Sequence, residues 1–99
     1  MPVFLPKEPT KKELSLTAVL YALSDEVRLA IVRQLAAGGE QPCGVFEVDR
    51  PKSSLSHHFR VLRESGVVST RKEGKALMNT LRSADLDARF PGLLRAVLN

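Results

Sequence analysis

The chain has 99 residues, of which 43% are hydrophobic and only five are aromatic, and its formal net charge is +4. This length fits one domain that buries somewhat less than about two-thirds of its unfolded surface. No apolar run approaches the roughly 20 residues that span a bilayer. The N-terminus also lacks the cationic start and long apolar region of a signal peptide. With a single cysteine, no internal disulfide can form, so we expect a cytoplasmic protein without membrane association.

Three prolines interrupt the first nine residues. Because proline fixes φ and lacks an N–H group, we expect residues 1–9 to form an extended or mobile arm. Residues 10–99 are expected to form the domain. Its first four residues, TKKE, have the S/T-x-x-E form of a capping box. They predict a first helix that runs to about Leu23.

The second predicted helix begins after Ser24 or Asp25, either of which is a good N-cap residue. The Gly38-Gly39 pair ends it. Two of its arginines, Arg28 and Arg33, are expected to face outward. Its buried stripe is predicted to be Val27, Ile31 and Leu35.

Helix-breaking residues dominate the next segment, residues 40–51. Pro42, Gly44 and Pro51 leave room for at most a short helix. That helix would pass through Val45, Phe46 and Val48.

Residues 52–65 are predicted to form the most informative helix of the chain. Leu55, Phe59 and Leu62 share one face and require a core to bury against. The opposite face is short-chained, hydrogen-bonding and partly cationic, which suits insertion into a DNA major groove. Taken alone, the pattern also fits an ordinary amphipathic helix with a solvated polar face. The polar face carries Ser53, His57, Arg60 and Glu64, with Ser54 and Ser56 at its edges.

A basic hairpin is expected directly after this helix. Gly66 ends the helix, and residues 67–71 and 76–81 read as two strands around a tip with one glycine and two lysines. From Arg50 to Lys75 there are seven basic and two acidic residues, a local charge of +5. The remaining eight basic and nine acidic residues give −1. The whole excess of positive charge therefore lies where it can neutralise DNA phosphates.

The C-terminal part is expected to return to helix. Residues 83–90 read as a turn or a short helix, and Pro91 at a first helical position opens a last, strongly apolar helix. The order of elements predicts a winged helix-turn-helix. The fold class is thus mainly α with a small β-hairpin (α+β).

Two segments resemble the ArsR/SmtB family of bacterial transcriptional regulators. Residues 22–31, ALSDEVRLAI, are similar to the family's AL-x-D-x-x-R-L-x-I, and residues 56–68, SHHFRVLRESGVV, are close to its SHHL-x-VLREAGLV. The resemblance covers roughly residues 14–98. It implies a homodimeric repressor that leaves its operator when an effector binds. The sequence does not indicate which effector this is.

The predicted partners are therefore double-stranded DNA and a second copy of the chain. The competing hypothesis is a winged-helix module that binds protein instead of DNA. Such modules usually lose the basic hairpin, here residues 67–81, which is called the wing. The predicted DNA-binding residues are Lys52, Ser53, Ser54, Ser56, His57, Arg60, Arg71, Lys72 and Lys75. Apolar stripes of the first and last helices would form a two-fold dimer on an inverted repeat through Leu16, Val19, Leu20, Leu93, Leu94 and Val97.

The sequence predicts neither a metal nor a cofactor. His57 and His58 are adjacent, so on a helix they point about 100° apart and do not chelate one ion together. We expect His58 to have a packing role. Cys43 is either a small buried hydrophobic residue or a redox-sensing thiol. No phosphate loop, nucleophile elbow or catalytic pair is present, so an enzyme is not expected.

Overall fold

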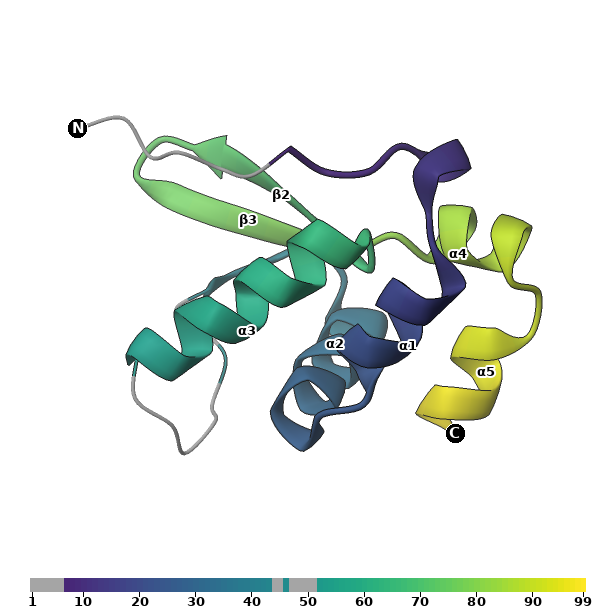
Figure 1. Ribbon diagram of the computed structural model, residues 1–99. Coiled ribbons are helices and arrows are strands. Elements are labelled where there is room, and N and C mark those ends of the chain that lie inside the picture. Colours follow the sequence, from purple (N-terminus) through teal and green to yellow (C-terminus); the bar gives the residue numbers. More distant parts are fainter. Residues whose placement is uncertain (1–6, 44–45, 47–51) are drawn as a thin grey trace.

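The computed structural model describes residues 7–43, 46 and 52–99, and the chain is mainly helical with one small antiparallel sheet (Figure 1), which confirms the predicted fold class. The sheet and helix α3 lie at one end of the molecule and α4 and α5 at the other. None of the helices described is long and apolar enough to cross a membrane. The elements in chain order are η1 (Lys11–Glu13), α1 (Leu16–Leu23), α2 (Glu26–Gly38), β1 (Gln41–Pro42), α3 (Lys52–Ser65), β2 (Val68–Glu73), β3 (Ala76–Leu81), α4 (Ser83–Arg89) and α5 (Leu93–Leu98).

The predicted first helix is two elements. The capping box forms, and the Glu13 carboxylate accepts a hydrogen bond from the backbone N–H of Thr10 at 2.9 Å. It opens only a 3₁₀ turn, because Leu14 leaves helical geometry and is buried with 3% exposure. Ser15 then caps α1 through its side chain. Burial of one leucine thus divides the segment that local signals predicted as continuous.

Helix α2 has the predicted ends. Asp25 is its N-cap, and the Asp25 carboxylate accepts hydrogen bonds from the backbone N–H groups of Val27 and Arg28 at 2.8 and 3.0 Å. Gly39 follows the helix with φ of 76°. Arg33 is exposed as predicted, but Arg28 is buried, which corrects the expectation that both face outward.

Helix α3 spans the predicted residues, and Gly66 ends it with φ of +84°. A Cβ atom at this position would lie 2.3 Å from Leu14 Cδ2 and 2.8 Å from Pro9 Cγ. Both the backbone conformation and the close approach therefore require glycine here. The tight turn brings the chain from α3 directly into the wing.

The wing is one strand wider than predicted. The sheet has the order β1-β3-β2, with β1 pairing antiparallel to β3. Asn79 of β3 is fully buried, and its side chain joins all three strands. Its Oδ1 accepts from Thr70 Oγ1 at 2.7 Å, while its Nδ2 donates to Gln41 O at 3.3 Å and to Cys43 Sγ at 3.1 Å.

The described part of the N-terminal arm follows the outer edge of β2 (Figure 1). The Glu8 carboxylate accepts hydrogen bonds from Ser69 Oγ at 2.8 Å and from the Thr70 backbone N–H at 2.9 Å. Arg82 Nη1 donates to Pro9 O at 2.7 Å. Glu8 and Pro9 are thus tied by hydrogen bonds to the hairpin and to Arg82, and residues 1–6 of the predicted arm lie outside the described residues.

The last helix starts later than predicted. Gly92, with φ of 84°, is its N-cap, so Pro91 is not a first helical residue. The short helix predicted within residues 40–51 lies mostly outside the described residues. Phe46 from that segment is buried against Phe59, with ring centroids 5.1 Å apart. The core consists of Leu14, Val19, Ala22, Leu23, Ile31, Val32, Leu35, Phe46, Phe59, Leu62, Val67, Val68, Leu86 and Leu94.

Candidate nucleic-acid interface

The polar face of α3 is exposed along its described side chains. Ser56, His57 and Arg60 are exposed, and Ser54 is half-buried. Arg60 Nε donates to Glu64 Oε1 one turn later, at 2.9 Å, and both side chains remain more than half exposed. For Lys52 and Ser53, also predicted to bind DNA, the structure describes a helical backbone only.

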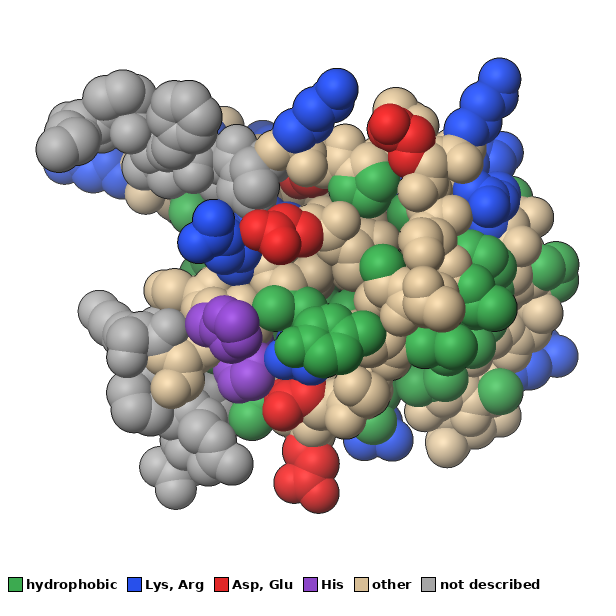
Figure 2. Space-filling model, in the orientation of Figure 1, with side chains coloured by type: hydrophobic (Ala, Val, Ile, Leu, Met, Phe, Trp, Pro, Cys, Tyr) green, Lys and Arg blue, Asp and Glu red, His purple; other side chains and the backbone are tan. Residues whose placement is uncertain are grey.

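The opposite face of α3 fixes how the polar face is presented. Phe59 and Leu62 are buried with 2% and 0% exposure, and Leu55 packs against the same core. Burial of these side chains holds the helix on the protein with His57 and Arg60 turned toward solvent. Figure 2 shows both histidines (purple) on the surface beside a hydrophobic patch.

The tip of the wing carries Lys72 and Lys75, which are both exposed. Within the described residues neither lysine forms an ion pair with a carboxylate. Gly74 has φ of 60° in the turn between the strands. The two ammonium groups are therefore exposed at the tip of the hairpin, and they suit contact with phosphates.

Arg71 has a different environment within strand β2 of the same hairpin. It binds Glu40 with both arms of the guanidinium, Nε to Oε2 at 3.0 Å and Nη2 to Oε1 at 2.6 Å. Nη2 also lies 3.0 Å from a carboxylate oxygen of Glu73. The hydrogen bond from Arg71 lowers the pKa of Glu40, and Glu40 raises the pKa of Arg71. Two carboxylates thus oppose the charge of this predicted DNA-binding residue.

Arg28 is buried at a junction of helices, although the sequence predicted it to face outward. It is 5% exposed; its Nε donates to Ala22 O at 2.8 Å and its Nη2 donates to Tyr21 O at 3.1 Å, both at the end of α1. Its Nη1 lies 3.2 Å from His58 Nδ1 on α3. The backbone N–H of Arg28 binds Asp25, whose pKa is lowered chiefly by that hydrogen bond. One side chain therefore links α1, α2 and α3.

The predicted dimer residues divide into two groups. Leu16 and Leu20 are 46% and 44% exposed, and Leu93 and Val97 are half-buried. Val19 and Leu94 belong to the core of the single chain, with 0% and 6% exposure, so they have almost no surface left for a partner. That placement corrects their assignment to an interface. Tyr21 is 59% exposed on the same helix as Leu16 and Leu20, and it was not among the dimer residues predicted from the sequence.

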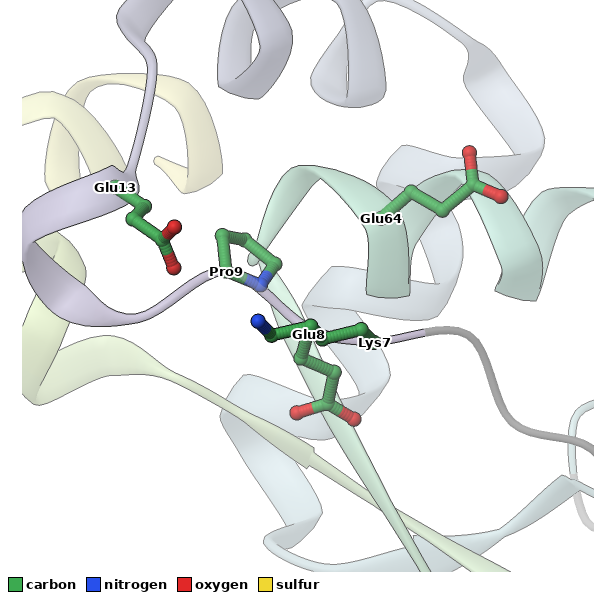
Figure 3. Close-up of a pocket in the computed structure, with 5 residues that line it drawn as sticks. All are labelled: Lys7, Glu8, Pro9, Glu13 and Glu64. Carbon is green, nitrogen blue, oxygen red and sulfur yellow. The ribbon is translucent and has the colours of Figure 1, made fainter.

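No metal-binding cluster is evident in the part of the chain that the structure describes. Within it, no group of three or more His, Cys, Asp or Glu side chains is arranged to hold a metal. Cys43 is half-buried beside Asn79. A hollow bordered by Lys7, Glu8, Pro9, Glu13 and Glu64 contains three carboxylates, but they do not converge (Figure 3). Each has its own partner, in β2, at Thr10 and at Arg60 respectively.

A helix held by its apolar side, followed by a basic hairpin, is the arrangement found in winged-helix DNA-binding proteins. A family model described as a helix-turn-helix domain matches residues 23–71. The HTH-type transcriptional regulator YceK of Bacillus subtilis (strain 168) is 38% identical over 82 residues, 80% of this chain and 82% of that protein. An arsenical resistance operon repressor of Staphylococcus aureus is also 38% identical, over 77% of this chain and 72% of its own length.

Solved structures agree with this classification. HlyU from Vibrio cholerae N16961 superposes with a TM-score of 0.66 and 33% identity, covering 81% of this chain and 88% of that one. The chain belongs to the ArsR/SmtB family and is a DNA-binding transcriptional regulator. The predicted family and DNA-binding function are thereby confirmed, in preference to a module that binds only protein.

Proposed function

We propose that this protein is a cytoplasmic homodimeric repressor that binds an inverted-repeat operator. The observation that carries the proposal is the exposed polar face of α3, followed in the chain by a hairpin with two exposed lysines that form no ion pair within the described residues. His57 and Arg60 would read base edges in the major groove, with Ser56 beside them. Lys72 and Lys75 would contact phosphates. Lys52, Ser53, Ser54 and Arg71 complete the proposed surface.

The test begins with selection of bound sequences from a random pool of DNA duplexes. An enriched inverted repeat supports a two-fold operator. His57→Ala and Arg60→Ala should each weaken binding of the selected duplex by about 1–3 kcal/mol without changing the fold. Arg33→Ala removes the same charge from the exposed face of α2 and should have little effect. Unchanged binding by the double variant His57→Ala/Arg60→Ala would reject α3 as the reading helix.

The dimer is proposed from the exposed leucines of α1. Leu16 and Leu20 lie one helical turn apart, with Leu93 and Val97 of α5 partly exposed. A two-fold dimer through these helices would place the two α3 helices about one DNA turn, roughly 34 Å, apart. Leu20→Glu is the appropriate test, because a charge at buried Leu94 would disrupt the core of the single chain. Sedimentation should show monomers that no longer bind the selected duplex. A wild-type protein that is already monomeric would refute the proposed dimer.

We further propose that DNA binding is independent of metal. Structural zinc needs about four converging ligands, and the described residues offer no cluster of three. Adding zinc or arsenite should leave the complex with the selected duplex intact. Tight stoichiometric binding of either that releases the DNA would overturn this proposal. A Cys43→Ser variant that binds DNA but ignores oxidant would identify a redox switch, whereas reduced stability with an unchanged response would indicate a packing role.

A further inference from the structure

Arg28 lies where three helices meet, and each part of its guanidinium has a partner there. The carbonyl groups of Tyr21 and Ala22 belong to the last turn of α1 and accept from Nη2 and Nε. Carbonyl groups at a helix C-terminus lack partners within the helix and favour a cation. The Tyr21 ring also lies 5.0 Å from the guanidinium carbon. The planar group is therefore fixed in position on α1.

The remaining arm of this fixed fork is directed at α3. Arginine donates hydrogen bonds only, so at 3.2 Å the Nδ1 atom of His58 is the acceptor. The Asp25 carboxylate lies 3.7 Å from the same nitrogen, outside hydrogen-bond range. The His58 side chain is only 14% exposed, and a hydrogen bond shielded from water is strong and directional. The contact therefore fixes one point of α3 relative to α1 and α2.

The apolar contacts of α3 decide which side of the helix faces solvent, but they fix its rotation less closely than a directional bond does. Burial of Phe59 and Leu62 holds the helix on the core, but hydrophobic contacts are not directional. Side chains of adjacent residues on a helix point about 100° apart, so the direction of His58 sets the direction of His57. A small rotation of α3 about its axis would move His57 and Arg60 away from the bases that they read.

We propose that Arg28 is a positioning residue for DNA recognition. Through the Nη1 to Nδ1 hydrogen bond with His58, it holds α3 in the rotation that presents its base-reading face. This inference rests on the proposed role of α3 in reading the operator. It concerns sequence-specific binding rather than the general attraction between a basic protein and DNA.

The variants separate the hydrogen bond from charge and bulk. Arg28→Lys keeps the positive charge but loses the planar fork. His58→Leu introduces an apolar side chain of similar bulk without an acceptor, whereas His58→Asn restores an acceptor oxygen near the position of Nδ1. Arg33→Lys is the matched control on the exposed face of α2. Affinity is measured for the selected duplex and for an unrelated duplex of equal length, under conditions in which circular dichroism shows every variant to be folded.

The expected result is a selective loss of specific binding. Arg28→Lys and His58→Leu should weaken binding of the selected duplex about 3- to 30-fold, with unchanged binding of the unrelated duplex. The double variant should lose no more than either single variant, because the same hydrogen bond is removed. His58→Asn should regain most of the affinity.

Three results would overturn the inference: wild-type affinity in the folded variants, equal losses for both duplexes, or additive losses in the double variant. The His57→Ala/Arg60→Ala variant distinguishes this failure from that of the proposed function. If that variant loses specific binding while the Arg28 and His58 variants do not, α3 reads DNA without positioning by Arg28. If it binds normally, α3 is not the reading helix, and both proposals fail.

Discussion

Arg28 and Arg71 each connect segments that are distant in the sequence, but they do so in opposite surroundings. Arg28 is 5% exposed and donates to two backbone carbonyls and a histidine. The Arg71 side chain is 55% exposed and binds the carboxylates of Glu40 and Glu73. Both use the guanidinium fork, yet water reaches only the second. Arginine therefore forms a buried contact between helices at Arg28 and a solvent-exposed ion pair in the wing at Arg71.

This difference separates two tasks in DNA binding. Reading bases requires a helix whose orientation does not vary, and buried directional bonds supply it. Neutralising phosphates requires charges that remain accessible, and an exposed hairpin supplies those. An exposed ion pair contributes little to stability because water screens it. We therefore expect variants at the helix junction to change folding and specificity, and variants in the wing to change general affinity.

The largest expected effect is on folding at Arg28. Arg28→Met should lower the free energy of unfolding by about 2–4 kcal/mol, because it removes the buried hydrogen bonds to Ala22 O, Tyr21 O and His58 Nδ1 and takes away the side-chain donor of Ala22 O. Arg71→Met should leave the denaturant midpoint unchanged. Chemical denaturation of both variants tests the comparison directly. Equal losses would show that burial does not distinguish the two arginines.

A smaller effect is expected at Asp25, which caps α2 beside this junction. Asp25→Ala should cost about 1 kcal/mol of unfolding free energy. The pKa of Asp25 is lowered in the folded state, so its contribution is present above the unfolded pKa of about 3.9 and is lost as pH falls through the folded value. Denaturation between pH 2 and 7 should therefore show a shallower acid loss in the variant. Asp25→Ser, which keeps a cap without that titration, should retain stability at neutral pH. A wild-type acid profile in Asp25→Ala would contradict this assignment.

The sequence predictions were right where the residues that determine an element lie within that element. Helix α3 and the strands around Gly74 were predicted because their periodicity and turn residues lie within the segments themselves. The TKKE capping box formed, but its signal could not reveal that burial of Leu14 would end the turn. In this segment local residues decided how the turn started, whereas packing decided how far it extended.

The missed features depend on partners far along the chain. Strand β1 has two residues and exists through its pairing with β3, so it left no periodic signal. Arg28 precedes Ile31, Val32 and Leu35 at the spacing of a buried helix face, i, i+3, i+4 and i+7. That spacing was the available sign of burial. Arg28 was nevertheless predicted to face solvent because it is charged. The carbonyl groups of α1 that accept its hydrogen bonds come close to it only in the folded chain.

In the wing, the expected effect is on DNA affinity rather than folding. The double variant Lys72→Gln/Lys75→Gln should bind the selected and the unrelated duplex more weakly, to the same extent. It should leave the denaturant midpoint of the protein unchanged. The slope of log affinity against log salt should become shallower by about 1 for each phosphate that the variant no longer neutralises. Titrations over a salt series measure this slope. A loss confined to the selected duplex would mean that the wing reads bases, which would break the proposed division between the two regions.

The smallest effect is expected at Glu40, and its direction is a gain in affinity. Because Arg71 holds the pKa of Glu40 below its usual range, this carboxylate stays ionised at neutral pH and occupies the fork that a phosphate would take. Glu40→Gln removes that competition, so binding of both duplexes should tighten a few-fold, and the salt slope should steepen by up to about 1. Glu13→Gln makes the same change of charge on η1, outside the wing, and should have a weaker effect. Equal gains in the two variants would attribute the effect to net charge, and Arg71 would then not be an exchangeable phosphate contact.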